Sequence, residues 1–78
     1  MNQTTKAQAI SQIDQILYEA QQDGAYRMTF AGAELELREA LDDAREYGDD
    51  RVWVKFGTEI CLPLDVVAAA FDTGRATF

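Results

Sequence analysis

The sequence predicts an α+β domain in which an N-terminal helix is followed by two strand–strand–helix units. The four strands form one antiparallel sheet, and the helices lie on one of its faces. Three observations lead to this fold class. Apolar residues recur every three or four positions over residues 5–23, as in an amphipathic helix. From residue 26 the period changes to two, as in a half-buried strand. The order of strand, turn, strand and helix then occurs twice, over 26–47 and 52–72.

The first element is a helix over residues 5–23. Thr5 and Gln8 have the spacing of a capping box, in which each side chain accepts a hydrogen bond from the backbone of the other residue. Gly24 follows at the position where a left-handed residue ends a helix. One side of the helix is apolar and predicts packing against a core. This side comprises Ile10, Ile13, Ile16, Leu17 and Ala20.

The second element is predicted to be a β-hairpin. Residues 26–30 and 34–37 both alternate between apolar and polar side chains, and an Ala-Gly-Ala turn separates them. A second interpretation remains open, because extending the next helix back to Ala33 would make Leu35 and Leu37 helical. The Glu-Leu-Glu-Leu alternation favours the hairpin.

The remaining elements are a short helix over residues 38–47 that ends at Gly48, a second hairpin over 52–62 with a Gly-Thr turn, and a helix from Pro63 to about Asp72. We expect the four strands to turn one apolar face toward the helices. That face would carry Met28, Phe30, Leu35, Leu37, Val52, Val54, Phe56, Ile60 and Leu62.

The composition limits the possible functions. A chain of 78 residues is enough for one small domain, and we expect residues 1–78 to form it, with flexible ends at 1–4 and 75–78. The 14 acidic and 7 basic residues give a formal net charge of −7, which disfavours direct binding of nucleic acid. No apolar run is long enough for a membrane span or an export signal, so a cytoplasmic protein without membrane contact is expected.

Enzymatic chemistry is also disfavoured. Histidine is absent and Cys61 is the single cysteine, which excludes an internal disulfide, Cys/His zinc patterns and nucleophiles activated by histidine. Adjacent acids such as Asp42 and Asp43 point about 100° apart on a helix and converge poorly on a metal ion. We therefore predict a protein that is not an enzyme and has no metal site and no cofactor.

Acidic residues are concentrated in the middle of the chain. Eight of the 14 lie between residues 34 and 50, against two arginines, so this segment carries −6 of the net −7. Four of them, at i, i+3, i+4 and i+7, share one face of a helix, where like charges destabilise it by a few tenths of a kcal/mol per pair. Such a face can serve solubility alone, or it can imitate the phosphates of nucleic acid and compete for a basic groove. The candidate contact residues are Glu34, Glu36, Glu39, Asp42, Asp43, Glu46, Asp49 and Asp50.

Aromatic side chains are candidate anchors, because they dominate binding hot spots. Strand alternation places Trp53 on the face away from Val52 and Val54. There it is either exposed or packed across strands, with the stems of Arg27 or Arg38 or against Cys61. Trp53 therefore joins the candidate contact residues. Further aromatic candidates are Tyr26, Tyr47 and Phe78.

A short, acidic domain without histidine that bears the four carboxylates Glu39, Asp42, Asp43 and Glu46 resembles the small phage-encoded inhibitors of host defence, anti-CRISPR proteins above all. These proteins share no motif, so the resemblance concerns size, charge and the carboxylates. It implies a non-enzymatic inhibitor, in the cytoplasm of the host cell, that blocks a CRISPR effector complex or nuclease. The expected partner is a basic nucleic-acid-binding protein or a CRISPR effector subunit, and the chain itself would be a monomer or a homodimer.

Two other functions remain open. The chain could be a structural or assembly module that forms a homodimer through a sheet edge or the helix over residues 5–23, with its acidity serving solubility only. It could also be a small metal-dependent hydrolase, which Mg²⁺ or Mn²⁺ would stabilise.

Overall fold

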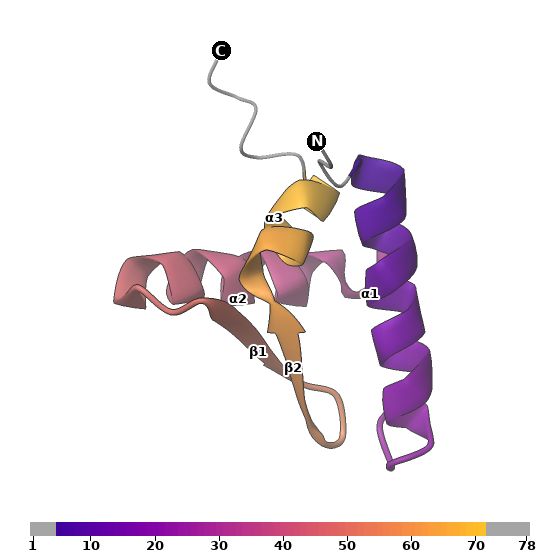
Figure 1. The fold of residues 1–78 in the computed structure, drawn as a ribbon. Coiled ribbons are helices and arrows are strands. Elements are labelled where there is room, and N and C mark those ends of the chain that lie inside the picture. The colour runs from indigo at the N-terminus through magenta and orange to yellow at the C-terminus, as the bar shows by residue number, and fades with distance from the viewer. Residues whose placement is uncertain (1–4, 72–78) are drawn as a thin grey trace.

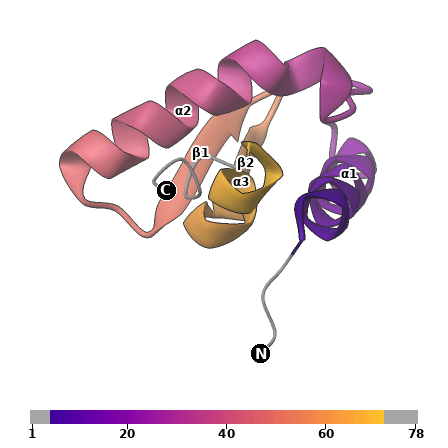
Figure 2. The same cartoon turned by 90° about the horizontal axis from the view of Figure 1, so that it is seen from above.

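The structure is a computed structural model that describes residues 5–71, and the ends predicted to be flexible, 1–4 and 75–78, lie outside this range. Within this range, three helices pack against one face of a β-hairpin (Figure 1). In chain order the elements are α1 (Lys6–Gln21), the 3-10 turn η1 (Ala31–Ala33), α2 (Glu34–Tyr47), β1 (Arg51–Lys55), β2 (Glu59–Pro63) and α3 (Leu64–Phe71). From above, α3 lies between α1 and α2 (Figure 2).

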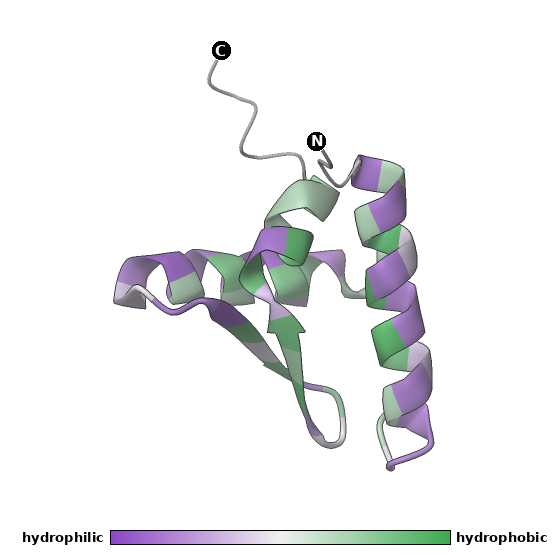
Figure 3. Cartoon of the chain, viewed as in Figure 1, coloured by the Kyte–Doolittle hydropathy of each residue, from purple (hydrophilic) through white to green (hydrophobic). Residues whose placement is uncertain are grey.

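Helix α1 confirms the sequence prediction closely. The Thr5 hydroxyl accepts a hydrogen bond from the Gln8 backbone N–H, and the Gln8 side-chain oxygen accepts one from the Thr5 N–H, both at 3.1 Å. This reciprocal pair satisfies two donors that an uncapped helix leaves without partners. Ala9, Ile13 and Leu17 form the buried side of the helix, and the alternation of hydrophilic and hydrophobic residues along it is visible in Figure 3.

The second predicted hairpin is also confirmed. Strands β1 and β2 are antiparallel, with Trp53 opposite Cys61, and a turn containing Gly57 at a φ of 87° connects them. Val52 and Val54 are buried under the helices, whereas Trp53 lies on the outer face and is 52% exposed. The alternation of burial along each strand therefore follows the alternation in the sequence.

The four-stranded sheet predicted from the sequence is wrong, because the sheet within residues 5–71 has two strands. Residues 34–37 form the first turn of α2, which is the interpretation that extended the helix back toward Ala33. Leu37 is fully buried while Leu35 is 67% exposed, so the two leucines do not share a face. The helix prevails because most of its 14 residues are strong helix formers, and because Glu34 and Glu36 stabilise the positive N-terminal end of its dipole.

The first predicted strand, residues 26–30, is instead an irregular connection that pairs with no strand, and Phe30 at its end has a right-handed helical backbone. Its single backbone hydrogen bond to the hairpin runs from the Tyr26 N–H to the Phe56 carbonyl, at 2.8 Å. A strand needs a partner along its length, and the segment that was expected to pair with it is helical. Met28 is nevertheless half-buried and Phe30 is buried, so this connection still contributes to the core.

The core lies between the inner face of the hairpin and the three helices. The rings of Phe30 and Phe71 approach to 5.1 Å between their centroids, which joins the connection before η1 to α3. No side-chain nitrogen or oxygen buried within residues 5–71 lacks a hydrogen-bond partner. The buried residues are Ala9, Ile13, Leu17, Phe30, Ala33, Leu37, Leu41, Ala44, Val52, Val54, Phe56, Ile60, Leu62, Val67 and Ala70.

One polar side chain connects α1 to this core. The Asp14 carboxylate accepts a hydrogen bond of 2.7 Å from the backbone N–H of Phe30, at the start of η1. We expect Asp14→Ala to lower the free energy of unfolding by about 1–3 kcal/mol, because it leaves a partly buried N–H without a partner. Asp14→Asn keeps an acceptor oxygen and should lower the free energy of unfolding by less. Urea denaturation of the two variants measures the difference, and equal losses would contradict the role of the hydrogen bond.

Candidate partner-binding surface

Four of the predicted contact residues form a continuous line of carboxylates on α2, which we call the acidic ridge. All four are exposed. At about 100° per residue, the ridge is centred opposite the buried side of the helix, where Leu41 lies. The amphipathic spacing that buries one side of α2 therefore presents the carboxylates on the other. The acidic ridge comprises Glu39, Asp42, Asp43 and Glu46.

The other predicted acids lie at the two ends of α2, and all are exposed. Glu34 and Glu36 belong to the first helical turn instead of a strand. Asp49 and Asp50 follow the helix, after Gly48 ends it with a φ of 74°. Asp50 forms an ion pair with the adjacent Arg51, at 4.0 Å between Oδ1 and Nε. At 100° per residue Glu36 lies beside the ridge, whereas Glu34 points about 130° away from its centre.

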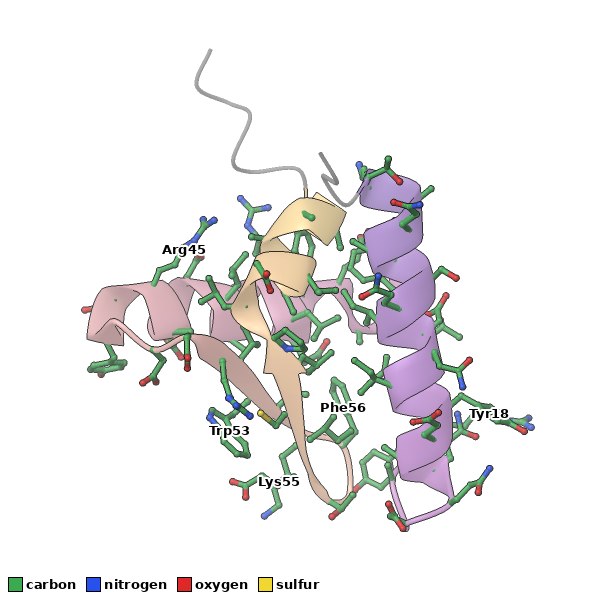
Figure 4. All side chains as sticks on the ribbon, in the orientation of Figure 1. Tyr18, Arg45, Trp53, Lys55 and Phe56 are labelled. Carbon is green, nitrogen blue, oxygen red and sulfur yellow. The ribbon has the colours of Figure 1, made fainter. Side chains whose placement is uncertain are left out.

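Opposite charges on α2 are segregated to different flanks. Within residues 5–71 no ion pair involves a carboxylate of the acidic ridge. The Arg38 guanidinium lies 5.9 Å from the centroid of the Phe71 ring, on the flank that faces α3. Arg45 projects from α2 away from Trp53 and Lys55 (Figure 4). The ridge carboxylates therefore belong to no salt-bridge network within residues 5–71.

A hollow of about 400 Å³ lies on the surface between α2 and strand β1. We call it the α2–β1 groove. Its α2 side carries carboxylates, whereas its β1 side carries cations and an indole, so the two sides differ in charge. The carboxylates of Asp42 and Glu46 lie outside it. The polar and aromatic residues that line the groove are Glu36, Glu39, Asp43, Tyr47 and Asp49 next to α2 and Arg51, Trp53 and Lys55 on β1.

Two aromatic side chains flank this groove and are available to a partner. Tyr47 is 76% exposed at the end of α2, and Trp53 projects from the outer face of β1 beside Lys55 (Figure 4). Trp53 was predicted as a contact residue, and its position on the face away from Val52 and Val54 is confirmed. Arg51 and Lys55 were not predicted as part of a site, because nothing in the sequence indicates that β1 runs beside α2.

The outer face of the hairpin holds the single thiol. Arg51 Nη1 donates a long hydrogen bond of 3.8 Å to Cys61 Sγ, and this bond, with the nearby carboxylate of Asp50, raises the pKa of the Arg51 guanidinium above its usual value. Arg51 is thus cationic at any physiological pH. Within residues 5–71 no three carboxylate or thiol side chains converge in a way that could hold a metal ion.

The arrangement can therefore form ion pairs and aromatic contacts with another macromolecule, but it contains no buried acid or base. None of the described helices is long and apolar enough to cross a membrane. No protein-family model, curated protein or solved structure matches this chain.

Proposed function

We propose that this chain is a non-enzymatic inhibitor that binds a basic nucleic-acid-binding protein through the acidic ridge and the acids at the ends of α2. In this proposal it is an anti-CRISPR-like protein that blocks a CRISPR effector complex or nuclease in the host cytoplasm. The observation that supports the proposal is the exposure of all four ridge carboxylates on one rigid helix, without an ion pair to any residue within 5–71.

The charge density of the ridge supports the comparison with nucleic acid. Its four carboxylates span the residues from 39 to 46, about 10 Å of helix axis at 1.5 Å per residue, or roughly one negative charge per 3 Å. Duplex DNA carries one negative charge per about 1.7 Å of its axis. A basic groove that accommodates DNA would therefore meet a surface with the same sign of charge as DNA and a linear charge density within about twofold of it.

The ridge also costs stability, which an acidic face needed only for solubility could avoid by spacing its charges. Glu39 and Asp43, and likewise Asp42 and Glu46, are four residues apart on α2. Each like-charged pair at this spacing destabilises a helix by a few tenths of a kcal/mol. The presence of two such pairs on one helix is consistent with recognition by a partner.

The test uses two variants with the same net charge. The ridge variant carries Glu39→Gln, Asp42→Asn, Asp43→Asn and Glu46→Gln. The control variant carries Glu19→Gln, Asp23→Asn, Glu59→Gln and Asp65→Asn, at exposed positions outside α2 and its ends. Candidate effector complexes and nucleases are loaded with fluorescently labelled DNA, and each protein is titrated against them to measure displacement. Proteins captured from a host lysate at low salt supply further candidates.

We expect the wild-type chain and the control variant to displace DNA, and the ridge variant to require at least about ten times the concentration. Raising the salt from 50 to 200 mM should weaken the wild-type chain by about tenfold or more, as for contacts made of several ion pairs. The free energy of unfolding of the ridge variant should also be higher by a few tenths of a kcal/mol, because two repulsive pairs are lost against one attractive pair, Arg38 with Asp42. Equal displacement by the ridge and control variants would refute the proposal.

A further inference from the structure

The side of strand β1 that faces away from β2 is open. The register pairs Val52 with Leu62 and Val54 with Ile60. The Leu64 N–H donates to the Asp50 carbonyl at 3.2 Å, and residues 50 and 64 continue the same register. Directly opposite residues in an antiparallel pair alternate between hydrogen-bonded and non-hydrogen-bonded, so the even-numbered residues of β1 bond to β2.

The backbone groups of Arg51, Trp53 and Lys55 consequently point to the open edge. Among the hydrogen bonds outside the β1–β2 ladder within residues 5–71, none uses their N–H or C=O groups. Three donors and three acceptors are thus available to an added strand, as in proteins that bind extended peptides by β-augmentation. The edge borders the α2–β1 groove, which is lined by residues of β1 and none of β2.

The charges of the groove specify what such a strand must carry. A strand added to β1 would turn every second side chain inward, toward the α2 wall that carries Glu36, Glu39 and Asp43. Lysine or arginine at the inward positions would place its aliphatic stem over Ala40 and its cation among these carboxylates. The outward positions would lie beside Arg51, Trp53 and Lys55, which excludes cations there and suits β-branched or polar residues.

We infer that the α2–β1 groove binds an extended segment of a partner protein that has a basic residue at every second position and pairs with the open edge of β1. This inference rests on the proposed function for the positive charge of the partner, and it names the element of the partner that is recognised. A second copy of the chain fits poorly, because antiparallel pairing of β1 about Trp53 would set Arg51 opposite Lys55 twice.

The probe is a synthetic, acetylated and amidated seven-residue peptide with lysine at positions two, four and six and threonine or valine elsewhere. A matched peptide has the same composition with its three lysines adjacent, so that it cannot turn all of them to the α2 wall. Binding is followed by Trp53 fluorescence, and hydrogen exchange of the Arg51, Trp53 and Lys55 amides reports pairing at the edge. We expect the alternating peptide to bind at least about five times more tightly and to slow the exchange of these three amides.

Two double variants separate the groove from the rest of the ridge. Glu39→Gln with Asp43→Asn removes carboxylates that line the groove, and Asp42→Asn with Glu46→Gln removes the two outside it. We expect the first pair to weaken the alternating peptide about tenfold and the second pair less than threefold. N-methylation of the peptide at even or at odd positions should abolish binding for one set, whose N–H groups face the edge, and spare the other.

Each alternative has its own result. Equal affinity for the two peptides, equal effects of the two double variants, or unprotected edge amides in the bound state would overturn the inference. Sedimentation as a dimer, with the three amides protected before peptide is added, would assign the edge to a second copy instead. If the wild-type chain displaces DNA and the ridge variant does not, but neither peptide binds the wild-type chain, the proposed function stands and this mode of docking is wrong. If the wild-type chain binds the alternating peptide but displaces no DNA, the groove binds a basic strand and the proposed function is wrong.

Discussion

Leu37→Ala is expected to lower the free energy of unfolding by about 2–5 kcal/mol, whereas Leu35→Ala should change it by less than about 0.5 kcal/mol. Leu37 is fully buried against the core, and its truncation leaves a cavity. Leu35 is 67% exposed on the opposite side of α2. The same chemical change, two residues apart, thus separates a core position from a surface position.

The pair also distinguishes the helix from the hairpin that the sequence favoured. In a strand over residues 34–37 both leucines would face the core, and both substitutions would be costly. Urea denaturation of the two variants, followed by circular dichroism, measures the difference. Because a domain of this size has only about 4–12 kcal/mol of stability, Leu37→Val serves as a milder variant if Leu37→Ala does not fold. Comparable losses for Leu35→Ala and Leu37→Ala would contradict the helix.

Gly57→Ala is expected to destabilise the protein by about 2–4 kcal/mol, the second large effect. Gly57 has a φ of 87°, which costs a residue with a side chain about 1–2 kcal/mol. An added Cβ would also lie 3.0 Å from Cε1 of Tyr26 and 3.1 Å from the carbonyl oxygen of Gly24. The ring can move aside, but the carbonyl belongs to the backbone, so the connection after α1 has to shift.

Gly48→Ala is the matched control for this prediction. Gly48 also has a positive φ, of 74°, but an added Cβ would meet no atom within 4 Å. Gly48→Ala should therefore lower the free energy of unfolding only by the cost of a positive φ, about 1–2 kcal/mol. Thermal and urea denaturation of both variants give the comparison. If the two substitutions cost the same, the contact between the hairpin turn and residues 24–26 is not as close as the structure shows.

The parts of the fold that were predicted correctly depend on neighbours in the sequence. The capping box of α1 joins residues three apart, and the β1–β2 hairpin joins strands through a short glycine turn. Gly48 ends α2 through its own left-handed conformation. Such local preferences are readable from single residues and their spacing, because the interacting groups are adjacent in the chain.

The segment over residues 26–37 was predicted incorrectly for the opposite reason. Four alternating residues, Glu-Leu-Glu-Leu, fit a strand, but they also fit a helix in which one leucine is exposed. The outcome depends on residues 38–47, which extend the same helix, and on the core that accepts Leu37 and Leu41 together. Once residues 34–37 are helical, residues 26–30 have no strand to pair with.

The candidate surface divides in the same way. The sequence by itself determined the acidic ridge, because the spacing that buries Leu37 and Leu41 turns the four carboxylates to the other side of one helix. Only the tertiary structure decided which of them line the α2–β1 groove. The rotation of α2 beside the open edge of β1 brings Glu39 and Asp43 into the groove with Trp53 and leaves Asp42 and Glu46 outside it. That rotation follows from core packing among α2, β1 and α3, which involves residues far apart in the chain.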